Sequence, residues 1–163
     1  MRRIFLLSAL LLMESTRPPK SPCIGVCSTG IGDSVCRGCK RYLHEVVNWN
    51  SYSPDEKRAV LDRISQLAEQ VLKSHVEIVD RDKLCAALSF QQIRFDENSG
   101  PYLWLLELLK MGATQIRSLD DFGCRLRRPD NGSTLESLRL QLDSDFYELS
   151  CAHYQRYFEQ SHR

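Results

Sequence analysis

Residues 23–39 read CIGVCSTGIGDSVCRGC and carry four of the seven cysteines of the chain. The cysteines form two close pairs, with C-x3-C spacing for Cys23 and Cys27 and C-x2-C spacing for Cys36 and Cys39. Glycine, serine and aspartate between the pairs are typical of a turn, which would bring the pairs together. Paired cysteines in a reducing compartment mostly bind a metal. We therefore expect these four cysteines to be the ligands of a metal centre.

Two other interpretations of the four thiols remain open. In an oxidising compartment they would form two disulfide bonds, although the odd total of seven cysteines argues against full pairing. Free structural cysteines usually lie among apolar side chains, whereas these four are flanked by polar and glycine residues. His44 is a fifth candidate ligand, but we expect it to point to solvent because four thiolates already complete a tetrahedral site.

A family resemblance supports the metal interpretation. The chain resembles the small bacterial family DUF1289, a domain of unknown function, in five features. These are the SPC opening at residues 21–23, the CRGC motif at residues 36–39, the basic Lys40, a helix ending at Trp49 and a Ser-Pro start to the next helix. The resemblance covers residues 21–66, and members of the family are often labelled as predicted iron–sulfur proteins. It implies that the same four cysteines are the metal ligands, and it implies no particular reaction.

Two candidates remain for the metal. Two separated cysteine pairs, the second leading into a helix, are the usual arrangement of a closed zinc site. Iron–sulfur sites more often have three cysteines at C-x2-C-x2-C spacing and the fourth farther away. The spacing therefore favours Zn2+, whereas the family resemblance favours an iron–sulfur cluster.

A long amphipathic helix is predicted after the cysteines. Ser53 precedes Pro54, and Glu56 stands three residues after Ser53, which is the pattern of a capping box at a helix start. The helix should run from Pro54 to about Lys73, and its apolar residues recur at helical spacing, so one face requires a buried partner.

A shorter helix is expected over residues 40–49, directly after the second cysteine pair. Leu43, Val46 and Val47 have helical spacing and would form its apolar face. This helix would place Cys39 near a helix N-terminus, whose partial positive charge favours the thiolate. The aromatic Trp49 is expected to lie in the core of the cysteine module.

The next part of the chain is predicted to contain short elements. Strands are expected over residues 76–79 and 92–95, and a helix capped by Asp80 is expected over residues 81–88. Cys85 and Cys124 are expected to be buried as small apolar side chains.

Two apolar helices are predicted toward the C-terminus. Residues 101–111 should form a buried helix that ends at Gly112. The last helix is expected to start at Ser133, with a broad apolar face suited to the core or to a dimer interface. Its main stripe consists of Leu135, Leu138, Leu142, Phe146 and Leu149, with Leu140, Tyr147, Cys151, Tyr154 and Phe158 beside it.

These elements predict a mainly α fold with one or two short strands, divided into three parts. Residues 1–20 would be a leader or an over-extended start plus a proline-rich linker, residues 21–74 the cysteine module with two helices, and residues 75–163 a mostly helical region. The apolar run near the N-terminus resembles a signal peptide but has no small-x-small cleavage site. We therefore favour Met13 over Met1 as the true start and a cytoplasmic protein; an exported or membrane-associated protein is the alternative.

The sequence also excludes several classes of function. Lys and Arg number 22 against 21 Asp and Glu, so no polyanion-binding charge excess is present and no nucleic-acid partner is expected. The apolar run near the N-terminus is too short for a stable membrane span. No phosphate-binding glycine loop, H-E-x-x-H or G-x-S-x-G motif occurs, so no catalytic residue is predicted.

The expected function is that of a metal-binding protein whose four-cysteine site organises a structural or interaction module. In this interpretation the helical face binds a protein partner or a second copy of the chain, and the protein is not an enzyme. The alternative is an iron–sulfur protein that transfers electrons or assists cluster chemistry.

Overall fold

The computed structural model describes residues 18–112, 116–128 and 134–159. Residues 1–13, for which a leader is predicted, and Ser133 fall outside these ranges. The chain divides into two units between Ile64 and Ser65, and each is described by itself. The fold is mainly α, which confirms the predicted class.

The first unit holds the two cysteine pairs and three short helical segments, followed by the start of a long helix. These elements are η1 (Ser28–Ile31), α2 (Leu43–Val47), η2 (Trp49–Ser51) and the N-terminal part of α3 (Pro54–His75). The capping box at the start of α3 is formed as predicted: Ser53 N donates to Glu56 Oε2 at 2.7 Å, and Glu56 N donates to Ser53 Oγ at 3.2 Å.

The helix predicted over residues 40–49 is much shorter than expected. Lys40 adopts a left-handed backbone conformation with φ of 59°, so α2 begins only at Leu43, and Cys39 does not lie at a helix N-terminus. The predicted apolar face is also wrong, because Leu43 and Val47 are exposed. The buried residues of this segment are Lys40, Arg41, Tyr42, Glu45 and Trp49, and Trp49 lies in the core as predicted.

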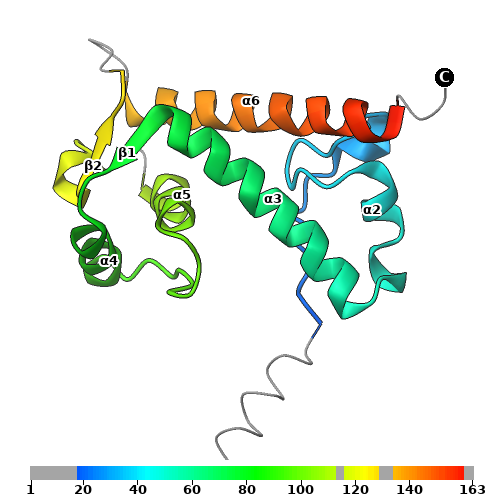
Figure 1. Ribbon diagram of the computed structural model, residues 1–163, viewed down its shortest axis with the longest axis horizontal. Coiled ribbons are helices and arrows are strands. Elements are labelled where there is room, and N and C mark those ends of the chain that lie inside the picture. The colour runs from blue at the N-terminus through cyan, green and yellow to red at the C-terminus, as the bar shows by residue number, and fades with distance from the viewer. Residues whose placement is uncertain (1–17, 113–115, 129–133, 160–163) are drawn as a thin grey trace, which may run out of the picture. The chain divides into compact units, whose positions relative to one another are not determined.

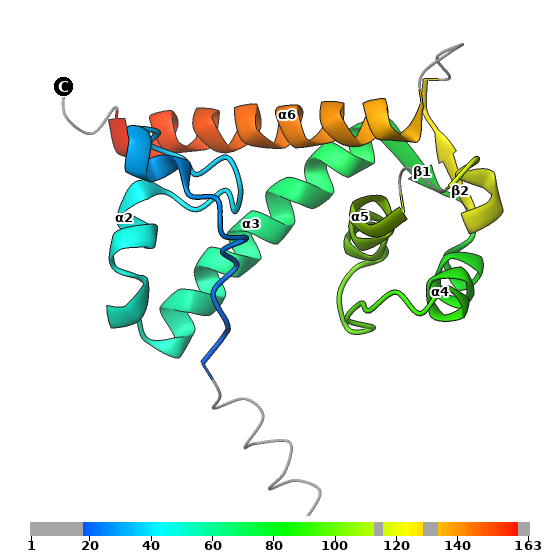
Figure 2. The ribbon, with the colours of Figure 1, turned by 180° about the vertical axis from the view of Figure 1, so that it is seen from behind.

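The second unit combines the C-terminal part of α3 with the remaining elements. They are β1 (Val76–Ile78), α4 (Arg81–Phe90), α5 (Pro101–Gly112), η3 (Asp120–Phe122), β2 (Cys124–Leu126), α6 (Leu135–Tyr154) and a π-helical end η4 (Gln155–Glu159) (Figure 1). The strand β1 continues directly from α3 and pairs antiparallel with β2, as Figure 2 also shows, with Val76 opposite Leu126.

Several predictions for this unit are confirmed and two are corrected. Asp80 caps α4 by accepting from Lys83 N at 2.9 Å, and α5 ends at Gly112. Residues 92–95 do not form a strand; the partner of β1 is β2 instead. The N-cap of α6 is Thr134, one residue after the predicted start, and it accepts from Ser137 N at 3.1 Å.

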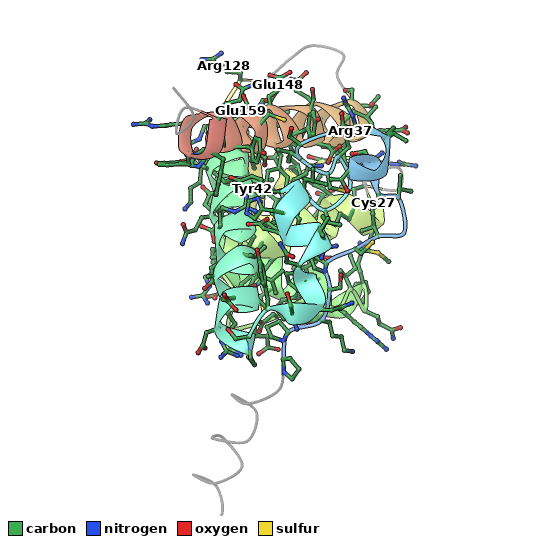
Figure 3. All side chains as sticks on the ribbon, turned by 90° about the vertical axis from the view of Figure 1, so that its right-hand side faces the viewer. Cys27, Arg37, Tyr42, Arg128, Glu148 and Glu159 are labelled. Atoms are coloured by element: carbon green, nitrogen blue, oxygen red, sulfur yellow. The ribbon has the colours of Figure 1, made fainter. Side chains whose placement is uncertain are left out.

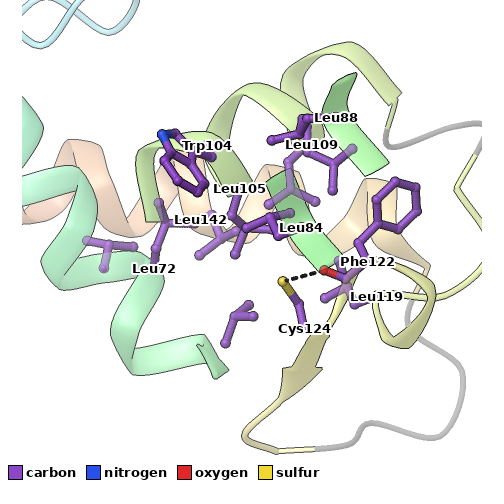
Figure 4. Packing of buried hydrophobic residues seen from close by; sticks show 13 residues of the cluster. Leu72, Leu84, Leu88, Trp104, Leu105, Leu109, Leu119, Phe122, Cys124 and Leu142 are labelled. Atoms are coloured by element: carbon purple, nitrogen blue, oxygen red, sulfur yellow. Dashed lines mark hydrogen bonds between the residues drawn. The ribbon is translucent and has the colours of Figure 1, made fainter. Parts of the chain in front are cut away.

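An apolar core holds the second unit together (Figure 4). Leu84, Leu88, Leu105 and Leu108 are fully buried, and each contributes about 1.5–3 kcal/mol relative to an exposed side chain. The main stripe predicted for α6 packs as expected, with Leu142 buried and Leu135, Leu138, Phe146 and Leu149 against the core. Cys124 is buried as predicted, whereas Cys85 is partly buried against the core.

Within the described ranges, no helix has the length and apolar character that a bilayer crossing requires.

Candidate metal centre

The second cysteine pair lies in a tight turn with a defined backbone. Cys36 N donates to Arg41 O at 2.8 Å, and Lys40 N donates to Cys36 O at 2.8 Å. An isolated antiparallel bridge between Val35 and Tyr42 continues this small ribbon beyond the turn. The chain therefore reverses direction between the two cysteines and places both thiols on the inside of the unit, where Cys36 and Cys39 are buried.

The surroundings of Cys36 stabilise a thiolate. Burial alone would raise the pKa of this thiol, but backbone amides of Cys39, Ser28 and Gly38 and the thiol of Cys39 donate to its sulfur and lower the pKa to about 7. Peptide N–H groups directed at a cysteine sulfur are typical of metal–thiolate sites, where they orient the ligand and balance its charge.

Cys39 has a different electrostatic environment. Burial raises the pKa of this thiol, and the guanidinium of Arg41 opposes that effect by donating from Nε to Cys39 Sγ at 3.3 Å. The same guanidinium lies over the ring of Trp49, 4.8 Å from its centroid. Arg41 is thus held between an aromatic face and the sulfur, and its positive charge would balance an anionic centre if one were bound there.

The first cysteine pair is exposed and is not gathered with the second. Cys23 Sγ accepts from Gly25 N at 3.4 Å, and Cys27 Sγ shares a hydrogen bond of 3.0 Å with Thr29 Oγ1. Cys27 lies on the loop at the edge of the unit (Figure 3). Among the described residues, no three cysteine, histidine or acidic side chains are grouped as metal ligands would be.

The backbone between Cys23 and Cys27 nevertheless lies directly against the second pair. A Cβ placed on Gly38 would be 2.8 Å from Val26 O and 3.0 Å from Ile24 Cγ1, so glycine permits this close approach. Ser28 adds a second connection, since its Oγ accepts from Arg37 N at 2.9 Å. The two cysteine-bearing loops are therefore neighbours, although their four sulfurs are not grouped.

A buried polar network behind the turn was missed by the sequence reasoning. Glu45 Oε2 accepts from Tyr42 N at 2.8 Å and from Arg63 Nη2 at 2.7 Å. The guanidinium of Arg63 also lies 3.7 Å from the centroid of the Tyr42 ring. The position of Glu45 three residues after Tyr42 was the available local signal for a cap, but the ion pair with Arg63 depends on tertiary packing.

The remaining candidate ligands do not add to this site. His44 is partly buried and its ring lies 5.8 Å from that of Tyr42. Cys85, Cys124 and Cys151 belong to the second unit. Burial, together with the charge of Asp120, raises the pKa of Cys124 to about 11, which disfavours the thiolate form that binds a metal.

The donor set of the first unit fits a thiophilic metal. Four thiols, amide donors at one sulfur and a guanidinium at another match the needs of zinc or an iron–sulfur cluster, since both are anionic when bound by four thiolates. The fold and this arrangement define a mainly α protein with an N-terminal cysteine module.

Comparisons with known proteins place this module in a family. A family model described as "Protein of unknown function (DUF1289)" matches residues 21–68. The Uncharacterized protein YdhL of Escherichia coli strain K12 is 38% identical over 58 residues, which cover 36% of this chain and 72% of that protein. The YdhL protein of Shigella flexneri has the same identity and coverage.

A third relative, the YdhL protein of Escherichia coli O6:H1, is 46% identical over 44 residues, which cover 27% of this chain and 54% of that protein. No solved structure shows significant similarity to the chain. The chain belongs to the DUF1289 family, which confirms the resemblance that the cysteine motifs indicated.

Proposed function

We propose that this protein binds a metal ion through Cys23, Cys27, Cys36 and Cys39, and that the ion organises the N-terminal module. The observation that carries the proposal is the tight turn that holds Cys36 and Cys39 buried together, where the surroundings of Cys36 lower its pKa. A thiolate, and not a thiol, is the metal ligand. A protein that stabilises a buried thiolate beside a second thiol has the main element of a metal–thiolate site.

The neighbouring loop supports the same proposal. The segment with Ile24 and Val26 lies close against Gly38, so Cys23 and Cys27 are on a loop that already touches the turn of the second pair. We favour Zn2+ because two separated cysteine pairs are the usual ligand pattern of a closed zinc site. The proposal also places the protein in a reducing compartment such as the cytoplasm, where the thiols stay free.

An iron–sulfur cluster is the second candidate for the same site. Hydrogen bonds to cysteine sulfurs are one of the means by which proteins set the reduction potential of such clusters, and Cys36 and Cys39 both accept them. A cluster would make electron transfer, and not structural organisation, the function of the module. Visible absorption separates the candidates, because Zn2+ is spectroscopically silent.

Serine substitutions test the ligand assignment. Each of Cys23→Ser, Cys27→Ser, Cys36→Ser and Cys39→Ser should remove bound metal from the purified full chain, because a lost thiolate forfeits much of a binding free energy of about 10–16 kcal/mol. Cys85→Ser, Cys124→Ser and Cys151→Ser serve as matched controls and should retain it. Equal metal loss in both groups, measured by elemental analysis, would show that the ligands are assigned wrongly.

A further inference from the structure

The two cysteine pairs differ in how far they are organised. The thiols of Cys36 and Cys39 are hydrogen-bonded to each other, and these residues are only 1% and 7% exposed. Cys23 and Cys27 are exposed and hydrogen-bond within their own loop, to Gly25 N and Thr29 Oγ1.

The backbone shows the same difference. The turn between Cys36 and Cys39 is fixed by hydrogen bonds on both sides, including Leu43 N to Ser34 O at 2.8 Å. The segment from Cys23 to Cys27 has no regular secondary structure. At its centre Gly25 has a φ of 89° and open space where a side chain would be, so the backbone can adjust there without a steric clash.

The sulfurs of the two cysteine pairs also differ in their surroundings. Cys36 and Cys39 accept from several backbone amides and from the guanidinium of Arg41, all of which the fold of the unit already orients. Groups that are already oriented bind a ligand without a further ordering cost, whereas a loop that must move loses conformational freedom when it binds.

We propose that the ion binds in two steps, first to the preformed half-site of Cys36 and Cys39 and then to Cys23 and Cys27, which close over it. This inference rests on the proposed metal site and assigns different roles to its two halves. Release follows the reverse order, so an incoming thiol ligand or chelator displaces Cys23 and Cys27 first. The exposed loop is therefore the face through which the metal is exchanged.

Alkylation of the metal-free full chain tests the preformed half-site without depending on metal binding. Brief treatment with iodoacetamide, followed by peptide mass mapping, should label Cys23 and Cys27 well before Cys36 and Cys39, because the first pair is exposed and the second pair is buried. Labelling of Cys36 as fast as Cys23 would overturn the proposal, since the half-site would then be open.

Cobalt binding tests the order of the ligands. The double variant Cys23→Ser/Cys27→Ser should lose its metal during purification but still take up added Co2+, more weakly than the wild-type chain and with weaker thiolate-to-cobalt charge-transfer absorption, because only two thiolates remain. The matched double variant Cys36→Ser/Cys39→Ser should bind Co2+ about 10–100-fold more weakly, because it lacks the oriented donors around the second pair.

The outcomes distinguish the two claims. Equal or reversed affinities of the double variants, with full binding by the wild-type chain, would overturn the two-step order and leave the metal site standing. Failure of the wild-type chain to bind Co2+ would overturn the metal site and the order with it. Circular dichroism of both variants reports whether the fold is retained, and the alkylation pattern of the wild-type chain does not depend on either variant.

Discussion

Replacement of Gly38 with alanine should separate the two cysteine loops. The added Cβ would lie 2.8 Å from Val26 O, and a backbone oxygen cannot be moved by a side-chain rotation. The segment from Cys23 to Cys27 would have to shift away from the second pair. Forced overpacking of this kind costs about 1–3 kcal/mol. If this contact is needed for metal binding, the affinity should fall about 5- to 150-fold, since 1.4 kcal/mol corresponds to a factor of ten.

The chain offers a matched control for this substitution. Gly30 lies between the same cysteine pairs, but a Cβ added there would have no atom within 4 Å, and its φ is not left-handed. Gly30→Ala should therefore bind metal as the wild type does. Competition with a chromophoric zinc chelator measures both affinities, and far-ultraviolet circular dichroism checks the fold. Equal affinities for Gly38→Ala and Gly30→Ala would refute the claim that the loops must touch at Gly38.

Three further predictions concern charge, core packing and pH. Arg41→Gln removes the donor to Cys39 and should weaken zinc binding about 10–100-fold in the same competition assay; unchanged affinity would contradict its role in positioning that sulfur. Leu108→Ala should lower the free energy of unfolding by about 2–5 kcal/mol in urea while metal content stays unchanged; a loss of metal would argue against the ligand assignment. Because the pKa of Cys36 is lowered from 9.0 to about 7, its ionisation stabilises the metal-free protein above pH 9, and this contribution is lost as the pH falls to about 7. Cys36→Ser should abolish that pH dependence in urea unfolding, and its persistence would show that another group causes it.

Local sequence signals predicted the long helices well. Ser53 with Glu56 and Asp80 with Lys83 form caps within a few residues of each other, so their hydrogen bonds can be anticipated without knowledge of the fold. The apolar run that forms α5 is long and ends at a glycine, and both features are local as well.

The errors arose where distant residues decide the structure. Apolar spacing favoured Leu43 and Val47 as the buried face of α2. In the structure these two residues are exposed, and Glu45 is buried instead, where it forms an ion pair with Arg63. The left-handed φ of Lys40 shortens the same helix, and nothing in a lysine signals it.

The second strand illustrates the same limit. Its pairing with β1 joins residues far apart in the chain, Val76 with Leu126 and Ile78 with Cys124. β2 has only three residues, and Arg125 separates Cys124 from Leu126, so its sequence alternates too briefly to have been recognised as the partner of β1. The cysteine site was predicted in part. The motif identified the four thiols, whereas the different burial of the two pairs became visible only in the structure.

Metal analysis of the full chain, purified without oxygen, tests the central claim most directly. We expect a stoichiometric zinc ion, no visible absorption band, and loss of the ion in Cys36→Ser but not in Cys124→Ser. Stoichiometric iron with acid-labile sulfide and a broad band that bleaches on reduction would keep the four-cysteine site but replace zinc with a cluster. A chain that contains no metal and takes up neither zinc nor iron would contradict the account.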